Sequence, residues 1–429
     1  MDDSLTFTTL GELIKKKREK IGISLSEVSR RTGVSKGVIS KIECGDTKSP
    51  ELRTLKPIAD VLDIPYEDII EYSIEIERRY GLYDDFLSEA IEISNPFLIN
   101  KVAIKFLENI KKETCSSLDH LYTLANTSTN NDAKVTLYTA IVTYARVHGL
   151  PHYIAKGLLQ KYLIERKDLK RMEESFKDGE EIIHYVDFLS HEEKINYYYR
   201  MALQAFAIKK YDRCIEIGNK GHTEDGTINE LKERVALAIL NSNSRMGNFT
   251  ELEKCLDMYV ALDYRLIIEK VKYFRAIILF KTGQHYEAIP LLKDCVEEAT
   301  KDNRLHRIND LIEVFLKIDD LDSLQHIFEQ EEKNTVVKIY TPYKYSELGK
   351  YYRYKGTFLV ERGLFNEGME AYLQSMYFYS KINDHNGIMG CQEDIYKYHC
   401  EKAKQMELPL LKKLTEVYNM VNKGDSKED

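Results

Sequence analysis

A run of small polar and basic side chains between positions 30 and 41 is the part of this sequence best suited to binding a ligand. Lysine and arginine neutralise phosphate groups, while hydroxyl groups and exposed backbone can bond to base edges. Such residues in one short stretch predict contact with double-stranded DNA. The predicted DNA-binding residues are Arg30, Arg31, Ser35, Lys36, Gly37, Ser40 and Lys41.

The sequence has no comparable pattern for catalysis. It lacks the Gly-x-x-x-x-Gly-Lys and His-Glu-x-x-His motifs, and its carboxylates are spaced as solvated helix faces. His399 and Cys400, with Cys391 nearby, form the one concentration of His and Cys, and neighbouring residues on a helix point to different sides. We expect no enzyme activity, no catalytic residue, no cofactor and no metal site.

Two short helices must position the basic stretch. Ser24 is a suitable N-cap for the first helix, and Glu27 three residues later predicts a capping box. Val28 is expected to face inward. Gly33 lies where the first helix must end and the chain must turn, which suits a residue that tolerates positive φ.

The second helix is predicted to begin after Ser35 as its cap. Val38, Ile39 and Ile42 would form its apolar side, with Lys36, Ser40 and Lys41 on the other. Two helices joined by a Gly-containing turn are the arrangement that places a recognition helix in the major groove.

Charge is distributed unevenly along the chain. The whole sequence carries a formal net charge of −8, but the segment 10–56 has twelve Lys or Arg against six Asp or Glu, a net charge of +6. The positive charge is concentrated where a phosphate backbone would be met. The acidic remainder argues against a nucleic-acid track through the rest of the chain.

The segment 10–70 resembles the helix-turn-helix domain of the Cro/C1-type (XRE) repressors. It departs from that family at Leu25, where Gln is usual, and at Gly37, where relatives carry a longer side chain. A helix-turn-helix used only for protein contacts is the alternative. The match rests on Leu10, Gly11, Ile14, Arg18, Gly22, Ile23, Ser24, Gly33, Val34, Ser35, Ile39, Ser40, Lys41, Ile42, Glu43, Gly45, Pro50, Leu55, Ala59, Leu62 and Pro65.

The length of 429 residues exceeds what one hydrophobic core supports, so two or more structural units are expected. A helix is predicted at 10–21, another at about 51–62, and a short one from Pro65. The predicted domains are the helix-turn-helix domain at 1–70, a charged linker helix at 71–81, a helical repeat domain at 82–422 and a disordered tail at 423–429.

The region 82–422 is predicted to be entirely helical, because apolar residues recur there at spacings of three and four. A turn followed by an aromatic residue or Leu recurs at positions 211, 249, 285, 321 and 365, which are 38, 36, 36 and 44 residues apart. A similar turn lies at 167–169. A period of this size indicates stacked helix pairs.

This region resembles tetratricopeptide repeats, whose consensus is about 34 residues. The resemblance implies an all-α, tetratricopeptide-like solenoid with a concave groove; a non-repeating helical bundle is the alternative. The final helix, about 408–421, has an apolar stripe that suits a terminal cap or a dimer contact. The last copy matches best, at Tyr352, Gly356, Gly363, Phe365, Tyr372 and Ser375.

Alignment of the copies by their turns places certain first-helix residues on the concave side. Asn offers both a donor and an acceptor to the backbone of an extended peptide, and Arg or Lys binds a carboxylate. The predicted peptide-binding residues are Asn196, Tyr199, Asn241, Arg245, Tyr273, Lys281, His306, Asn309, Arg353 and Thr357.

The combination resembles the RRNPP group of Gram-positive bacteria and their phages, and its overall plan resembles the NprR-like and phage arbitrium (AimR-like) regulators. The resemblance implies a quorum-sensing transcriptional regulator that binds operator DNA, acts as a homodimer and is switched by a short signalling peptide in the groove. A Rap-like regulator, which binds or dephosphorylates a response regulator, is the alternative. A repressor whose helices serve only for oligomerisation is a third.

The sequence also predicts a cytoplasmic location. No apolar run is long enough to span a bilayer, and the first residues lack the features of a signal peptide. Seven scattered cysteines without a Cys-x-x-Cys pair are typical of a reduced compartment.

Overall fold

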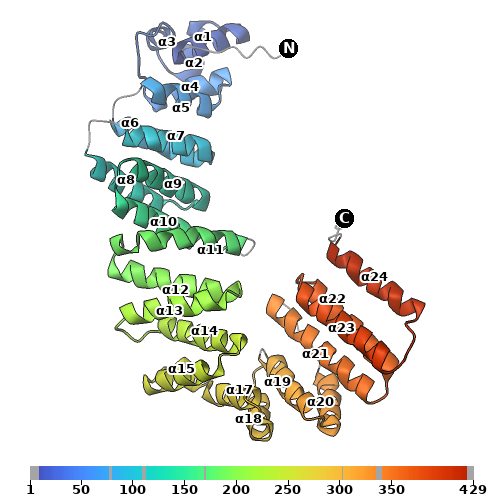
Figure 1. Ribbon diagram of the computed structural model, residues 1–429. Coiled ribbons are helices and arrows are strands. Elements are labelled where there is room, and N and C mark those ends of the chain that lie inside the picture. Colours follow the sequence, from blue (N-terminus) through green and yellow to red (C-terminus); the bar gives the residue numbers. More distant parts are fainter. Residues whose placement is uncertain are drawn as a thin grey trace. The chain divides into compact units, whose positions relative to one another are not determined.

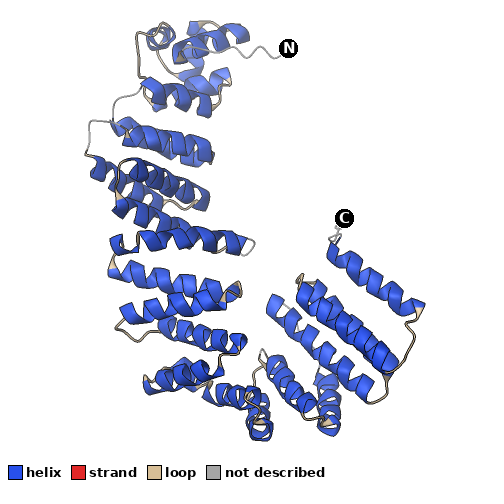
Figure 2. Cartoon of the chain, viewed as in Figure 1, coloured by secondary structure: helices blue, strands red, loops and turns tan. Residues whose placement is uncertain are grey.

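The computed structural model describes residues 9–76, 80–108, 113–168, 171–301, 303–334 and 341–422. Every regular element in these ranges is a helix, and they contain no strand, which confirms the predicted all-α class (Figures 1 and 2). The chain divides into two compact units, Met1–Thr227 and Ile228–Asp429. None of the described helices combines the length and the apolar character that crossing a bilayer requires.

The N-terminal helices follow the predicted order. Leu13, Ile14, Val28, Ile39 and Leu55 are buried and form the core of this part. The five helices are α1 (Leu10–Ile21), α2 (Leu25–Thr32), α3 (Lys36–Glu43), α4 (Leu52–Leu62) and α5 (Tyr66–Ile76).

The predicted caps of the helix-turn-helix are confirmed. The Oγ atoms of Ser24 and Ser35 accept the backbone N–H groups of Glu27 and Val38, and Gly33 has a φ of 70°. Two details of the prediction are wrong. The Glu27 carboxylate does not complete a capping box, because it accepts hydrogen bonds from two arginines, and Val38 is 40% exposed instead of packing with the buried apolar side.

Close contact between α1 and α3 fixes the position of the second helix of the motif. The Arg18 guanidinium donates from Nε and Nη2 to the two carboxylate oxygens of Glu43, at 2.7 and 2.8 Å, and from Nη1 to the carbonyl of Ile23 at 3.2 Å. A Cβ added to Gly11 would lie 2.3 Å from the carbonyl oxygen of Ile42. The two backbones therefore approach at a position that only glycine can occupy.

The rest of the first unit is a series of consecutive helices. α5 contacts α4 and also α6 and α7. Nζ of Lys101 on α7 lies 3.4 Å from Oε1 of Glu71 on α5. Residues 77–79 of the predicted linker and the tail 423–429 lie outside the described residues, so the predicted domain limits stay a prediction. The helices are α6 (Tyr80–Ile93), α7 (Pro96–Leu107), α8 (Thr114–Thr127), α9 (Asn131–Val147), α10 (Pro151–Glu165), α11 (Met172–Glu180), the 3-10 helices η2 (Glu181–His184) and η3 (Val186–Phe188), α12 (His191–Ala207) and α13 (Tyr211–Glu224).

The second unit continues the pattern of helices packed on their sequence neighbours. α14 contacts α15, α17 contacts α18, and α21 contacts α22. The helices are α14 (Glu230–Met246), α15 (Phe249–Ala261), α16 (Arg265–Ile268), α17 (Val271–Lys281), α18 (His285–Glu297), α19 (Arg304–Lys317), α20 (Leu321–Asn334), α21 (Pro342–Glu361), α22 (Phe365–Ser380), α23 (His385–Glu401) and α24 (Leu408–Asn422).

The five predicted repeat turns are confirmed, because positions 211, 249, 285, 321 and 365 are the first residues of α13, α15, α18, α20 and α22. The residue two positions earlier has positive φ in every turn, and the residue between donates its N–H to the carbonyl five residues back. This pattern is a Schellman motif. The left-handed residues are Lys209, Gly247, Gly283, Asp319 and Gly363. The sixth turn, at 167–169, falls partly outside the described residues.

The last predicted copy shows why small residues recur. A Cβ on Gly368 would lie 3.0 Å from the carbonyl oxygen of Gly356, so α21 and α22 pack backbone to backbone there. Ser375 is buried and donates from Oγ to the carbonyl of Gly349 at 2.6 Å. These contacts pack α21 against α22 as a tetratricopeptide-like helix pair.

The predicted apolar stripe of the final helix, α24, is partly buried and partly exposed. Leu414 and Val417 are buried, and Leu410 packs against the same core. Leu411 and Tyr418 are exposed, so the stripe does not form one buried face. The side chain of Val421 lies outside the described residues. α24 covers α22 as a terminal helix, whereas its role in a dimer stays a prediction.

Replacing Gly283 with Ala should destabilise the turn between α17 and α18 by about 1–2 kcal/mol, because a side chain in the left-handed region meets the following carbonyl. Hydrogen exchange of peptides that cover 271–297 in the full chain would measure this local loss. Gly226→Ala is the matched control, since that glycine has no positive φ and open space around its Cβ position. Equal exchange in the two variants would contradict the role assigned to the turn.

Candidate functional site

The solvent side of α3 gathers most of the predicted DNA-binding residues. Lys36, Gly37 and Lys41 are exposed and Ser40 is half-buried, and at 3.6 residues per turn these four positions share one side of the helix. Ile39 and Ile42 are buried on the opposite side. Ser35 lies just before the helix as its cap. The face therefore combines a hydroxyl, two ammonium groups and a glycine that leaves the backbone accessible.

The basic residues of this domain differ in their partners. Within the described part of the chain, neither Lys36 nor Lys41 has a carboxylate partner. Arg30 and Arg31, at the end of α2, both donate to the carboxylate of Glu27. The hydrogen bonds from Arg30 and then Arg31 lower the pKa of Glu27 to about 2. A DNA phosphate would have to compete with this carboxylate for the two arginines.

The predicted peptide-binding residues of the first unit lie on α12 and differ in access. Asn196 is half-buried, and its Oδ1 accepts a hydrogen bond from Nε of Arg200 at 3.2 Å. Tyr199 is fully buried, and its hydroxyl donates to Oδ2 of Asp225 at 3.1 Å. The prediction that Tyr199 binds a peptide is therefore wrong, because its side chain packs in the core and exposes no surface to a ligand.

In the second unit, two of the predicted residues lie together on α14. Asn241 is half-buried and donates from Nδ2 to the carbonyl of Leu237 at 2.9 Å, and Arg245 is exposed one turn later.

Three further predicted residues in this unit already have partners. Lys281 forms an ion pair with Glu313, and Arg353 donates from Nε to Asp394 at 2.6 Å. The Thr357 hydroxyl is 2.8 Å from that of Tyr372, which joins α21 to α22. The two cations could exchange their carboxylates for those of a ligand, whereas Thr357 serves helix packing.

Tyr273, His306 and Asn309 belong to a polar network that joins α17, α19 and α21. The Tyr273 hydroxyl donates to Oδ2 of Asp310 at 2.9 Å and lies 2.6 Å from Nε2 of His306. Asn309 donates from Nδ2 to both the carbonyl and the carboxylate of Glu347, at 2.8 and 2.9 Å. The other ring nitrogen of His306 is 3.5 Å from the same carboxylate.

Burial and charge act against each other in this network. Burial raises the pKa of Tyr273 well above its usual value, with a further contribution from Asp310, and burial also raises the pKa of Asp310. Burial disfavours the ionised form of Glu347 too, but His306, Lys350 and Asn309 outweigh it and hold its pKa at about 2. Asn309 is only 3% exposed. Its amide therefore clamps α19 to α21, which corrects the prediction that it faces a ligand.

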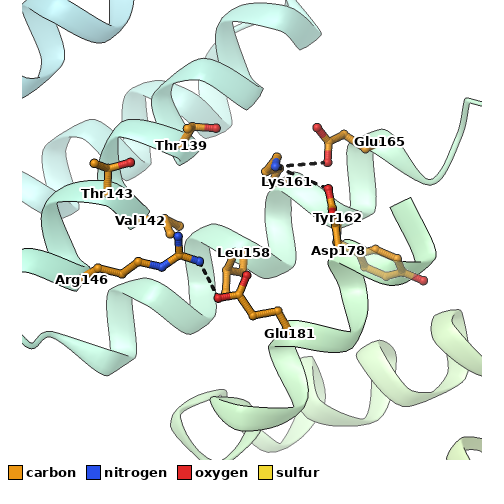
Figure 3. Close-up of a pocket in the computed structure, with 10 residues that line it drawn as sticks. All are labelled: Thr139, Val142, Thr143, Arg146, Leu158, Lys161, Tyr162, Glu165, Asp178 and Glu181. Atoms are coloured by element: carbon orange, nitrogen blue, oxygen red, sulfur yellow. Dashed lines mark hydrogen bonds and ion pairs between the residues drawn. The ribbon is translucent and has the colours of Figure 1, made fainter. Parts of the chain in front are cut away.

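A cleft that the sequence did not indicate lies in the first unit between α9, α10, α11 and η2 (Figure 3). Its volume is about 150 Å³. Lys161 on its wall lies 3.7 Å from Glu165 and 3.8 Å from Asp178, and Arg146 donates to Glu181. Both cations thus have carboxylates beside them, and none of the predicted binding residues lines the cleft. No group of side chains suited to a metal occurs among the described residues.

Residues 14–69 match a protein family described as Helix-turn-helix. The chain is 28% identical over 122 residues to the HTH-type transcriptional repressor RghR of Bacillus subtilis, a match that covers 27% of this chain and 88% of RghR. It is also 32% identical over 68 residues to the HTH-type transcriptional regulator SinR of the same organism, covering 16% of this chain and 61% of SinR.

Alignments with two solved structures cover most of the chain at low identity. One is PlcR of Bacillus thuringiensis in complex with the peptide PapR7 and DNA, at 17% identity, 92% coverage of this chain and 98% of PlcR, with a TM-score of 0.23. The other is a Rap protein complexed with competence and sporulation factor, at 10% identity, 92% and 100% coverage, and a TM-score of 0.36. Scores this low do not establish a common three-dimensional arrangement.

The geometry of α1–α5 and the family match define a DNA-binding domain of the helix-turn-helix (XRE) type. This domain and the similarity to the regulators RghR and SinR identify the chain as a helix-turn-helix transcriptional regulator.

Replacing both Lys36 and Lys41 with Ala should weaken DNA binding and reduce the slope of log affinity against log salt by about two, since each lysine neutralises one phosphate. Gel shifts at several salt concentrations with a duplex selected from a random library would measure this. Lys167→Ala with Lys177→Ala, two exposed lysines near α11, is the matched control. An unchanged slope would remove α3 from the interface.

Replacing Glu27 with Gln should strengthen binding and steepen the salt dependence, because Arg30 and Arg31 lose an anionic competitor. The Ser24 cap is kept, since it uses the backbone N–H of residue 27. Glu51→Gln is the control, because Glu51 pairs with Arg53 in the same domain and its loss changes the net charge equally. Equal effects of both variants would mean that total charge alone governs affinity.

Proposed function

We propose that this chain is a peptide-gated transcription factor of the cytoplasm, which binds operator DNA as a homodimer and is switched by a short signalling peptide. One observation carries the proposal. The 122 residues that match RghR are 88% of that repressor but 27% of this chain. Most of the chain therefore lies beyond what such a repressor needs, and that remainder is an array of helix pairs.

Helix-pair arrays present extended surfaces to extended ligands. In the second unit, Asn241 and Arg245 offer an amide and a guanidinium one turn apart on α14. Lys281 and Arg353 hold carboxylates that a ligand's carboxylate could replace. This set would pair with the backbone and the anionic groups of a peptide. Asn196 on α12 is proposed as a separate contact in the first unit.

A switch requires that the peptide bind one of two arrangements more tightly than the other, because equal affinity would shift nothing. α5 is placed to report such a change, since it contacts α4 of the DNA-binding domain and α6 and α7 of the repeat region. In a dimer, two recognition helices about 34 Å apart would meet successive turns of the major groove. A change in that spacing would alter operator affinity without unfolding either domain.

Asn241→Ala should cost about 1–3 kcal/mol of peptide affinity by leaving backbone groups of the ligand unpaired. Calorimetry with synthetic peptides from short reading frames beside the gene would measure it, with gel shifts in parallel. Asn219→Ala, an exposed asparagine on α13 outside the proposed site, is the control.

Two outcomes would contradict different parts of the proposal. If the Asn241 variant bound a peptide like the wild type, the site would be misplaced. If the protein bound DNA but no peptide changed that binding, gating would fail while the regulator class would stand.

A further inference from the structure

One apolar residue of α3 faces water. Ile39 and Ile42 are 0% and 2% exposed, whereas Val38 is 40% exposed. Val38 follows Gly37 and precedes Lys41 by three positions, so it lies beside Lys41 at the edge of the solvent face. It is thus part of the surface that carries Lys36 and Lys41.

The fold gains little from valine at this position. A β-branched side chain loses rotamer freedom in a helix, and a half-exposed one buries only part of its apolar surface. Alanine or a polar straight-chain residue would suit an eight-residue helix better. Local rules of this kind are broken most often where a residue serves function.

The neighbouring position allows close approach to a ligand. Apart from its two chain neighbours and the backbone of its own helix, no atom lies within 4 Å of a Cβ built on Gly37, so the surface beside Val38 is open. Both residues lie in the first turn of α3, and the N-terminal residues of a recognition helix are those that contact base edges in the major groove.

We propose that Val38 is a specificity-determining residue whose side-chain methyl groups contact the 5-methyl group of a thymine. The inference rests on the assignment of α3 to the DNA major groove. Thymine alone presents an apolar group there, while the other base edges present donors and acceptors. Valine against those edges would leave polar groups without partners. Val38 therefore selects thymine at one position of each half-site and disfavours the other bases.

The test uses the full chain and a duplex that the wild-type protein selects from a random library. Each thymine of one half-site is replaced in turn by deoxyuridine, which removes only the methyl group. The wild type should lose affinity about fourfold at one position, as burial of one methyl group supports. Val38→Ala should bind more weakly and be insensitive to deoxyuridine at that position. Ile21→Ala, which removes an exposed apolar side chain from α1, should keep the wild-type sensitivity.

Three results would overturn the inference. A deoxyuridine series without effect on the wild type excludes a methyl contact. Unchanged sensitivity in Val38→Ala assigns the contact to another residue, and a change of oligomeric state with an unchanged series assigns Val38 to a protein contact. Failure of the wild type to select or bind any duplex is a different outcome, because it removes the DNA-binding assignment itself. Circular dichroism and hydrogen exchange over 10–62 verify that each variant is folded.

Discussion

The bidentate ion pair between Arg18 and Glu43 is the interaction on which the DNA-binding surface depends. Both side chains are largely removed from water, at 13% and 4% exposed, and the pair joins the end of α1 to the end of α3. Loss of the Arg18 side chain would leave the buried Glu43 carboxylate without its partner, at a cost of about 3–5 kcal/mol. Lysine could not replace Arg18, because it lacks the planar fork that meets both carboxylate oxygens. The pair thus sets which side of α3 faces solvent.

The charged side chains of this molecule differ in how deeply they are buried and in whether they have an oppositely charged partner. These two properties distinguish those that hold helices together from those that can meet a ligand. Glu43 and Glu347 are both buried carboxylates held by several donors, and both join helices distant in sequence. Lys36 and Lys41 are of the opposite kind, since they are exposed and, within the described ranges, have no carboxylate beside them. Arg30 and Arg31 are intermediate, because they are exposed but share Glu27. A ligand phosphate gains most from Lys36 and Lys41, because neither lysine has to break an ion pair within the described part of the protein first.

The sequence predicted what depends on neighbouring residues. Caps and repeat turns are local, so Ser24, Gly33 and the starts of α13, α15, α18, α20 and α22 were placed correctly. Burial depends on distant partners, which explains the errors at Tyr199, whose partner Asp225 follows the end of α13, and at Asn309, whose partner is Glu347 on α21. The rotation of α3, and with it the exposure of Val38, follows from contacts with α1. The Glu27 pairing could have been found, because its spacing to Arg30 and Arg31 is the helical i+3 and i+4.

In the recurring Schellman turn, a backbone N–H of the turn donates to a carbonyl in the first helix of the same pair. The N–H of Lys210 donates to the carbonyl of Ala205, and that of Gln284 donates to the carbonyl of Leu279. The geometry of a pair is therefore independent of how long the connection to the next pair is. Differences in copy length can accumulate in those connections without disturbing the helices on either side. Such connections are the natural places to splice in a fluorescent label or an affinity tag, and also the places where related chains would drift apart in length.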